Sequence, residues 1–414
     1  MAERVIDSAS YSGVIRQEDE RKMATTVSDT GKRVAQASGS APTTWSGVDL
    51  VGLTLTEANT IPAFAPRPGA RIAGFDLWDM WPVEQADGSL PRFDGAALWM
   101  VLTAPTQPDP DARHVLARIH LVSERDGQWT LHQPVFPEGF TPGDREWSGS
   151  AVLDEAQERL TVYFTAAGRR GSAVVTLEQR LFEANCRFQA SEGSFTLSDW
   201  SNPVESVVAD GNDYMVANQI TGIGGEIFGF RDPGFFRDPA SGRTFLFLTG
   251  SCARSSSQWT GVIGVAEAER AAASGWRLLP PVLSAAGLNN ELERPHMRVV
   301  AGRYYLFWST QRKVFAAGGP SGPTGLYGAV ADGPLGPYTL LNGSGLVAGN
   351  PVQAPAQEYS WWVMDDLQVV GFADFPGIAD PAAITTADQR RAGFAGHPAP
   401  FFRIALDGAT SRVI

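Results

Sequence analysis

Four short apolar runs recur along this chain, and their spacing constrains the possible folds more than any other feature. Each run is six residues long, consists mainly of aliphatic and aromatic side chains, and ends in a hydroxyl residue. The runs occupy residues 98–103, 160–165, 244–249 and 304–309. In a chain with 44 Gly and 28 Pro to provide turns, short apolar segments of this kind predict buried β-strands rather than long helices.

A motif containing a tryptophan or a carboxylate precedes each run by 12 to 20 residues, and Asp79, Trp147, Asp232 and Glu293 mark these motifs. A β-hairpin explains this spacing, since one strand would carry the motif and the next strand would be the apolar run. Repetition at intervals of about 60 to 85 residues is typical of propeller blades with long loops, so we predict an all-β propeller. The alternative is a β-sandwich with the acidic residues on unrelated edges.

The remaining local patterns add detail to this prediction. Further strands are expected at residues 114–122, 128–132, 361–364 and 367–372, and one short helix is expected at residues 266–273. We predict an N-terminal segment, partly irregular, over residues 1–44, and a single propeller domain over residues 45–414.

Composition and charge exclude several classes of function. The formal net charge of −12 at pH 7 disfavours nucleic acid and anionic membranes as partners, because both bind basic surfaces. No apolar run is long enough to span a bilayer. The five histidines are scattered and the two cysteines, Cys186 and Cys252, form no metal-binding motif, so no zinc site is expected. The cysteines are expected to be unpaired, with a single disulfide as the alternative.

The N-terminal segment bears on location. It is rich in Ser, Ala, Thr and charge, and it lacks the apolar centre of a secretory signal. We expect an extracellular protein exported by a route without a cleaved leader. A cytoplasmic location, and a leader missing from this sequence, are the alternatives.

Three acidic residues stand inside frames of aromatic residues, arginine or proline, where an unpartnered buried charge would be costly. They are Asp79, Asp232 and Glu293. The innermost strands of a propeller meet at its axis, so residues far apart in sequence can share one central pocket. A nucleophile, an orienting charge and a general acid/base are the groups that a retaining glycosidase needs, and the residues therefore predict this chemistry.

Asp79 lies between Trp78 and Trp81 in the first motif. On a strand, Asp79 would face away from Trp78, toward a pocket whose aromatic walls stack on sugar rings. As the alternative, Asp79 would cap a turn before Pro82, but Asp76 is the better candidate for that turn.

The second carboxylate, Asp232, has a near copy six residues later at Asp238. Asp-Pro readily begins a turn, and Asp238 is followed by the turn-forming residues Pro, Ala, Ser and Gly. We therefore assign the turn to Asp238 and the site to Asp232, which would accept hydrogen bonds from sugar hydroxyls.

Glu291 and Glu293 are two residues apart and would share one strand face. Two like charges so close favour the protonated form of one of them, as a general acid requires. Arg294 and His296 could decide which carboxylate is protonated. An exposed strand edge is the alternative for this pair, although Pro295 and the aromatic strand after it indicate burial.

Trp147, Ser148 and Tyr359 lie in segments that combine large aromatic rings with small hydroxyl residues. Such segments suit the wall of a sugar-binding pocket, where a flat ring packs on a sugar face and hydroxyls form hydrogen bonds. The alternative is a core aromatic residue beside a tight turn.

Four motifs, in their order along the chain, resemble those of glycoside hydrolase family 68, which comprises levansucrases, inulosucrases and some bacterial β-fructofuranosidases. They are Trp-Asp-x-Trp-Pro (78–82), Glu-Trp-Ser-Gly-Ser-Ala (146–151), Phe-Arg-Asp-Pro (230–233) and Glu-x-Glu-Arg-Pro-His (291–296). Each motif alone is weak, but four in order are specific, and the resemblance runs from about residue 45 to the C-terminus. It implies a five-bladed β-propeller with a central, funnel-shaped active site.

The resemblance also implies roles for individual residues. Asp79 resembles the nucleophile that forms a fructosyl-enzyme, Asp232 resembles the transition-state stabiliser, and Glu293 resembles the acid/base. The residues that resemble sucrose-binding positions, or border them, are Trp78, Trp147, Ser148, Arg231, Glu291, Arg294, His296, Gln311 and Tyr359. The implied function is a levansucrase-type fructosyltransferase that cleaves sucrose with retention and transfers fructosyl to fructan, saccharides or water, without a cofactor.

Two positions depart from the family pattern. Asn290 stands where many Gram-positive members have an Asp that serves a structural calcium, so we expect no metal. Gln311 stands where members usually have Arg or His beside the acceptor subsite. A mainly hydrolytic or oligosaccharide-forming β-fructofuranosidase is therefore the alternative function.

Three other interpretations can be weighed on the sequence. Family 32 invertases carry Asn-Asp-Pro-Asn-Gly and Glu-Cys-Pro motifs, and neither occurs here. Arabinan-type five-bladed hydrolases use three acids in an inverting arrangement, with carboxyl groups about 6.5–9.5 Å apart instead of about 5–5.5 Å. A non-catalytic carbohydrate-binding propeller would lose one or more of the acids, whereas this chain has all three.

Overall fold

The computed structural model describes residues 41–414 except 68–69, 192, 219–226 and 270–274. The chain divides after Gly39, and all described residues belong to the unit Ser40–Ile414. Most of the N-terminal segment expected over residues 1–44 therefore lies outside the described residues. Strands make up most of the regular secondary structure of the described part, whose one α-helix is α1 (Ala387–Gly393), as the all-β prediction requires.

The longer strands fall into five consecutive groups, within each of which neighbouring strands pair antiparallel. The first two groups are β2 (Phe75–Glu84), β4 (Ala96–Pro105), β5 (Arg118–Arg125), β6 (Gln128–Pro134), and β7 (Arg145–Asp154), β8 (Arg159–Ala167), β9 (Gln179–Ser191), β10 (Ser194–Ser198). The third is β12 (Phe230–Arg237), β13 (Thr244–Ser251), β14 (Gly261–Ala268), β15 (Trp276–Ser284). The fourth is β16 (Glu293–Val300), β17 (Arg303–Thr310), β18 (Gly325–Ala331), β19 (Thr339–Leu340), β20 (Leu346–Gly349), and the fifth is β21 (Glu358–Val363), β22 (Gln368–Ala373), β24 (Phe402–Asp407), β25 (Thr410–Val413).

Short strands complete the edges of these groups. They are β1 (Thr43–Thr44) beside β15, β3 (Arg92–Phe93) beside β4, β11 (Val204–Val207) beside β9, and β23 (His397–Pro398) beside β22. The parallel pairing of β1 with β15 places Thr43 and Thr44 in the sheet, and Trp45 follows directly into the core. The Trp45 ring packs 5.4 Å from Trp308 and 5.0 Å from Tyr327, so the start of the described chain is anchored on the third and fourth groups.

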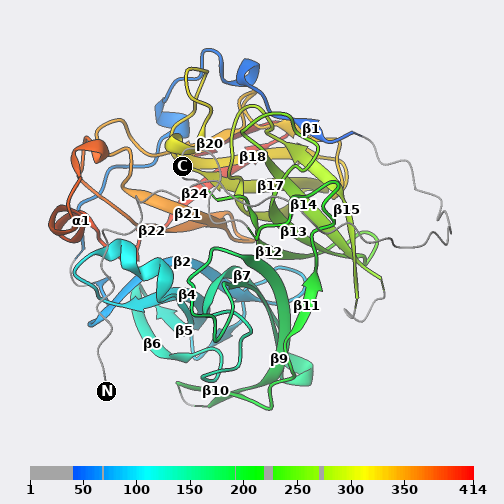
Figure 1. Ribbon diagram of the computed structural model, residues 1–414, viewed down its shortest axis with the longest axis vertical. Coiled ribbons are helices and arrows are strands. Elements are labelled where there is room, and N and C mark those ends of the chain that lie inside the picture. Colours follow the sequence, from blue (N-terminus) through cyan, green and yellow to red (C-terminus); the bar gives the residue numbers. More distant parts are fainter. Residues whose placement is uncertain (1–40, 68–69, 192, 219–226, 270–274) are drawn as a thin grey trace, which may run out of the picture. The chain divides into compact units, whose positions relative to one another are not determined.

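The first strands of the five groups lie side by side around the middle of the unit. Contacts run from β2 to β7, from β7 to β12, from β12 to β16, from β16 to β21 and from β21 back to β2, and Figure 1 shows several of these strands meeting there. β2 and β7 also pair directly, in parallel, at Val83 and Ala151, which joins the first two groups into one sheet of ten strands. Residues that are hundreds of positions apart in sequence are thereby brought together.

The predicted hairpins are confirmed. The four apolar runs fall in β4, β8, β13 and β17, and each pairs antiparallel with the strand that carries the preceding motif. The expected run at 114–122 is only partly a strand, because residues 114–115 end the 3-10 turn η5 (Pro110–Val115).

The helix expected at residues 266–273 is wrong for its described residues. Residues 266–268 end strand β14, where Ala266 pairs with Leu246 of β13 and with Leu278 of β15. Pairing on both sides of this central strand overrides the helical preference of a segment rich in Ala and Glu. The remainder of the expected helix, apart from Glu269, lies outside the described residues.

The cysteines follow the main expectation. Cys186 is buried in β9, Cys252 is half-buried, and both are free thiols. Among the residues described, no helix has the length and apolarity needed to cross a bilayer.

Candidate active site

Every one of the five first strands is interrupted by a β-bulge at an equivalent place. The bulges lie between Leu77 and Met80, Trp147 and Gly149, Arg231 and Gly234, Glu293 and His296, and Tyr359 and Trp362. A bulge adds one residue to one strand, bends it and redirects a side chain. Three of these bulges contain Asp79, Ser148 and Asp232, and the other two are bordered by Glu293 and Tyr359. The same backbone irregularity therefore occurs in all five first strands.

Three bulge residues have the left-handed backbone conformation that residues other than glycine rarely adopt. The φ angles are 58° at Asp232, 53° at Arg294 and 65° at Ser360. Such strain persists where surrounding contacts fix it, and it concentrates at functional sites. Here the Asp232 N–H donates to Thr165 Oγ1 at 2.9 Å, and the Arg294 N–H donates to Asp232 Oδ2 at 3.3 Å.

The bulges surround one cavity of about 470 Å³. Ten of the twelve residues expected at the site line it: Trp78, Asp79, Trp147, Ser148, Arg231, Asp232, Glu291, Glu293, Gln311 and Tyr359. They come from all five strand groups, as a site at the meeting point of the first strands requires. The sequence prediction that the three carboxylates share one pocket is therefore in accord with the geometry.

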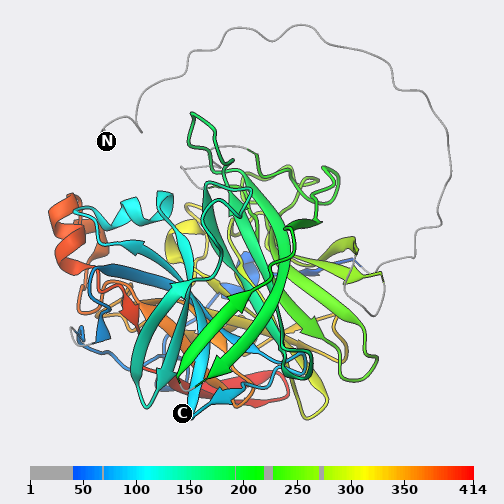
Figure 2. The ribbon, with the colours of Figure 1, turned by 90° about the horizontal axis from the view of Figure 1, so that it is seen from below.

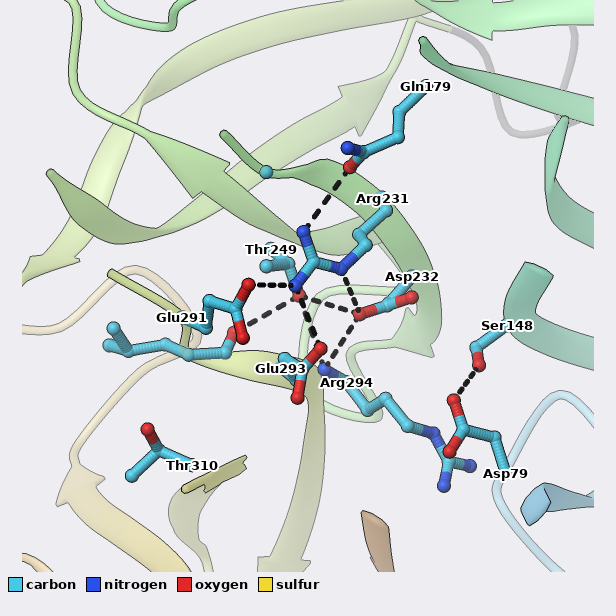
Figure 3. A network of polar contacts seen from close by, with 12 residues as sticks. Asp79, Ser148, Gln179, Arg231, Asp232, Thr249, Glu291, Glu293, Arg294 and Thr310 are labelled. Carbon is cyan, nitrogen blue, oxygen red and sulfur yellow. Dashed lines mark hydrogen bonds and ion pairs between the residues drawn. The ribbon is translucent and has the colours of Figure 1, made fainter. Parts of the chain in front are cut away.

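Asp79 is held by a neighbouring strand. The Ser148 hydroxyl, on β7, donates to Asp79 Oδ2 at 2.5 Å, and Figure 3 shows the two side chains facing each other. Beside the carboxylate, the Trp78 ring is flanked by Arg113, whose guanidinium lies 5.7 Å from the ring centre. The Asp79 carboxylate is thus oriented by a hydrogen bond from Ser148 next to an aromatic wall.

Arg231 is the hub of the polar network. Its Nη2 lies 2.8 Å from Glu293 Oε1 and 3.3 Å from Glu291 Oε1, and its Nε lies 3.6 Å from Asp232 Oδ2. Burial by itself lowers the pKa of Arg231, but the three carboxylates outweigh this effect, so its pKa lies above the ordinary value. One permanent, buried cation therefore holds three acidic groups in a fixed arrangement (Figure 3).

Asp232 is buried and balanced between opposing influences. Burial raises the pKa of Asp232 to about 6, the Arg231 guanidinium opposes this rise, and the carboxylates of Glu293 and Asp79 add to it. The Thr249 hydroxyl donates to Asp232 Oδ2 at 2.9 Å. Asp232 is therefore mainly ionised at neutral pH and becomes protonated when the pH falls only slightly below neutral.

Glu293 is the more accessible carboxylate of the network, with 18% of its side chain exposed. The Tyr359 hydroxyl donates to Glu293 Oε2. Burial, Glu293 and Glu291 raise the pKa of Tyr359 well above its ordinary value, so the phenol keeps its proton and remains a donor. Glu291 lies just before β16 rather than on it, yet it reaches the same guanidinium as Glu293.

Arg294 and His296, the two remaining residues expected to bind substrate, lie outside the lining of the cavity. Arg294 donates to the carbonyl oxygen of Ser360 at 2.6 Å and to that of Met80, and so joins β16 to β21 and β2. The His296 ring stacks on Trp362 at 4.4 Å. Both side chains are buried, which favours support of the site over direct contact with substrate.

The two other aspartates of the motifs also have clear places. Asp238 accepts hydrogen bonds from the N–H groups of Ala240 and Ser241 at 3.0 and 3.2 Å, so the expected turn is confirmed. Asp76 as a turn residue is wrong: it lies within β2, is 1% exposed, and forms an ion pair with Arg391.

Sequence reasoning missed several residues of the cavity wall. They are Leu102, Asp111, Arg113, His114, Ile227, Lys313, Ala356, Phe372, Asp374, Phe375, Pro381, Ile384 and Arg390. For Asp374 a signal was present, since it stands between Phe372, Phe375 and Pro376 in the same kind of frame that identified the three predicted acids. The others come mainly from turns such as η5, whose approach to the cavity no local pattern indicates.

The described residues contain no group of three or more His, Cys, Asp or Glu side chains that could hold a metal ion. At the position discussed for calcium, Asn290 Oδ1 accepts a hydrogen bond from the Thr260 N–H at 3.0 Å. A carboxamide in this place acts as a structural acceptor between loops.

The arrangement as a whole suits acid-catalysed displacement at a sugar carbon. One carboxylate, Asp79, is oriented by a hydroxyl; a second, Glu293, is accessible and hydrogen-bonded to a phenol; and a third, Asp232, is buried beside a cation. A nucleophile and a general acid/base on opposite sides of a bond are the parts that glycosyl transfer with retention needs.

Comparison with known proteins agrees with this chemistry. The model of glycoside hydrolase family 68, described as Levansucrase/Invertase, matches residues 34–261 and 254–414. Levansucrase LscA of Pseudomonas savastanoi pv. glycinea is 30% identical over 414 residues, which cover 90% of this chain and 94% of the relative.

Solved structures give the same result. The inulosucrase from Halalkalicoccus jeotgali bound to kestose is similar with 36% identity and a TM-score of 0.83, over 90% of this chain and 95% of that one. The β-fructofuranosidase catalytic domain of Microbacterium saccharophilum K-1 is similar with 25% identity and a TM-score of 0.76, over 92% and 93%. Because the family model and these relatives span nearly the whole chain, the protein belongs to glycoside hydrolase family 68, the levansucrase and invertase family.

Proposed function

We propose that this protein is a sucrose-cleaving fructosyltransferase of the levansucrase type, which acts through a covalent fructosyl-enzyme. The observation that carries the proposal is the cavity in which Asp79, Asp232 and Glu293 meet, with two of them held by Arg231. Membership of the levansucrase and invertase family supports sucrose as the donor.

In the first step, the Asp79 carboxylate attacks the anomeric carbon of the fructosyl unit. The bond from that carbon to the glucosyl oxygen breaks, and Glu293 donates a proton to this oxygen, so glucose leaves. The hydrogen bond from Ser148 orients the Asp79 carboxylate before the reaction. Less orientational freedom is therefore lost when one of its oxygens attacks.

In the second step, the Glu293 carboxylate removes a proton from the acceptor hydroxyl. The acceptor oxygen attacks the anomeric carbon, and Asp79 leaves as a carboxylate. Water, sucrose or a growing fructan can serve as acceptor, and two inversions give net retention. Hydrogen bonds from the Arg231 guanidinium and the Tyr359 hydroxyl hold Glu293 in place for both proton transfers.

Asp232 acts without changing its covalent bonds. Its buried carboxylate accepts hydrogen bonds from hydroxyls of the fructosyl ring, and its negative charge stabilises the positive charge that develops on the ring at the transition state. Trp78 and Trp147 provide flat apolar walls for the sugar faces.

A mainly hydrolytic β-fructofuranosidase is the second candidate. The observation that favours it is Gln311, a neutral side chain on the cavity wall where an Arg or His would hold an acceptor more strongly. A neutral amide weakens a sugar acceptor relative to water, so it would increase the hydrolytic share.

For the architecture, we propose a single five-bladed β-propeller over residues 45–414. The five groups of strands and the cyclic contacts of their first strands support this count. The pairing of β2 with β7 would then be a local fusion of two blades at their inner strands.

We further propose an extracellular place of action. A polymer of fructosyl units cannot diffuse across a membrane, so an enzyme that acts outside the cell needs no separate export of its product. Detection of activity in the medium and not in washed, lysed cells of the natural source would support this location, and the reverse distribution would support a cytoplasmic one.

A sucrose digest tests the main proposal. Glucose released well in excess of free fructose indicates transfer, and equal amounts indicate a hydrolase. Release of neither sugar refutes the assignment of sucrose. For the retaining mechanism, the carboxyl groups of Asp79 and Glu293 should lie about 5–5.5 Å apart in a crystal structure.

A further inference from the structure

A fourth carboxylate, Asp374, lines the same cavity as Asp79, Asp232 and Glu293. It directly follows β22, which ends at Ala373. In the proposed mechanism every step is complete without this residue. Its placement therefore calls for a role of its own.

The strand register shows on which side of the site Asp374 lies. Tyr359 on β21 pairs with Phe372 on β22, and Glu358, the first residue of β21, pairs with Ala373. Asp374 therefore lies beyond the strand end, before the point where β21 enters the ring. Phe372 and Asp374 are two residues apart, share one face and both line the cavity.

The backbone at Asp374 is firmly held. Its N–H donates to the Gln357 carbonyl at 2.9 Å, and its own carbonyl accepts from the Ala395 N–H at 2.7 Å. By contrast, its Oδ1 is buried and has no hydrogen-bond partner among the described residues. A buried carboxylate oxygen without a donor is costly, so a function is a physical reason for its retention.

Charges of both signs act on Asp374: Arg113 and Lys313 on one side, and the carboxylates of Asp111 and Asp79 on the other. Arg113 and Lys313 favour its charged form, although burial dominates and raises the pKa of Asp374 to about 6. Arg113 is itself fixed, since its Nη1 donates to the Pro110 carbonyl at 2.9 Å and its guanidinium lies 4.6 Å from the centre of the Phe394 ring. The Asp374 carboxylate thus lies near two cations, of which Arg113 is held in place, and two other carboxylates.

The wall beside Asp374 is made by turns rather than by first strands. Arg113 belongs to η5, Lys313 belongs to η8 (Arg312–Val314), and Arg390 belongs to α1. An ion pair between Arg390 and Asp109 ties α1 to the start of η5, and Figure 2 shows α1 next to the cyan segment that contains η5. These three elements line the cavity together with the bulges that carry the three acids.

From this placement we propose that Asp374 binds the sugar unit next to the fructosyl ring: the glucosyl unit of the donor in the first step and the acceptor sugar in the second. The inference rests on the proposed function. A carboxylate accepts hydrogen bonds from pyranose hydroxyls, and the part of the Asp374 side chain that lines the cavity can receive them. Asp374 is thus a specificity-determining residue that contacts the leaving group and the acceptor.

The test compares two donors that share the fructosyl unit but differ in leaving group: sucrose, and nitrophenyl β-fructofuranoside, which carries no second sugar. The variants are Asp374→Ala and the isosteric Asp374→Asn. The matched control is Asp388→Asn, which removes an exposed carboxylate from α1, away from the cavity wall.

For Asp374→Ala we expect KM for sucrose to rise roughly 10- to 100-fold, the range for loss of hydrogen bonds to a charged group. The ratio of transfer to hydrolysis should fall with it, because water needs no sugar contact. The loss of kcat/KM on the nitrophenyl donor should be at least tenfold smaller. Asp374→Asn, which keeps one acceptor oxygen, should lie between the wild type and Asp374→Ala, and Asp388→Asn should match the wild type.

Equal losses on the two donors would overturn the inference, because they would assign Asp374 a structural role only. Unchanged kinetics on sucrose would overturn it as well. If Asp374→Ala does not fold, the same comparison is made with Asp374→Asn. Failure of the proposed function is distinguishable, since it appears as a wild-type enzyme that does not cleave sucrose at all.

Discussion

Replacing Arg231 by Met should destabilise the protein in a manner that depends on pH. Arg231 is 4% exposed, and its guanidinium lies 2.8 to 3.6 Å from oxygens of Glu293, Glu291 and Asp232. Methionine has a similar length but no charge, so Arg231→Met removes the cation that these three carboxylates share, while the hydrogen bonds of Asp232 and Glu293 from Thr249 and Tyr359 remain. Removal of one partner from a buried ion pair costs about 3–5 kcal/mol.

The corresponding change in melting temperature follows from the size of the protein. The entropy of unfolding is about 2 cal/mol/K per residue, which gives roughly 0.8 kcal/mol/K for a folded unit of this size. The expected loss is therefore about 4–6 °C at pH 7.5. The matched control is Arg187→Met, which removes a surface ion pair with Glu158, half-exposed on both sides, and should change stability by at most about 1 kcal/mol.

The pH dependence gives the sharper criterion. The pKa of Asp232 in the folded protein is about 6, above its unfolded value, so its ionisation opposes folding as pH rises through 6. Without Arg231 this opposition grows, because the cation that favours the ionised form is gone. The difference in melting temperature between Arg231→Met and the wild type should therefore be smaller at pH 5 than at pH 7.5, as measured by calorimetry at both pH values. A difference that is equal at both pH values, or no larger than that of Arg187→Met, would refute the reasoning.

Three further predictions concern activity and metal. Ser148→Ala should lower kcat on sucrose roughly 10- to 100-fold with a small change in KM, because it removes the donor that orients Asp79; an unchanged kcat in steady-state assays would contradict this. Activity should fall as pH drops through about 6, because Asp232 becomes protonated there. Thr249→Val should move this acidic limb of the kcat/KM profile to higher pH, because the hydrogen bond that it removes favours the ionised form of Asp232. An acidic limb at the same pH in the variant would count against this role of Asp232. Treatment with a chelator should change neither the melting temperature nor the activity, and a clear loss reversed by calcium would show a metal site that involves residues beyond those described.

The sequence allowed much of the fold and of the site to be predicted for a definite physical reason. Buried strands of a sheet need apolar runs, and a carboxylate beside aromatic and proline residues needs a special environment. Both requirements leave local traces, as at residues 98–103 and 244–249 and at Asp79 and Asp232.

The errors arose where the outcome depended on distant residues. Asp76 resembles a turn residue locally, but its charge is neutralised by Arg391, more than 300 positions away. Arg294 is expected to border the substrate because it belongs to the fourth motif, whereas the bulge after Glu293 and a left-handed φ at Arg294 direct this side chain to Ser360. No local pattern of residue types distinguishes a regular strand from a bulged one at these positions.

The five bulges have a consequence for how such a site can change over time. Each bulge sets the direction of one side chain, while regular pairing resumes on both sides of it, so the identity of the projected residue is nearly independent of the rest of its strand. A substitution at one bulge can alter the chemistry without a change of register, whereas deletion of a single bulge residue would make the sheet more regular and leave one of the five positions empty. In this architecture, the irregularity of the backbone sets where a side chain points, and the residue at that position supplies the chemistry.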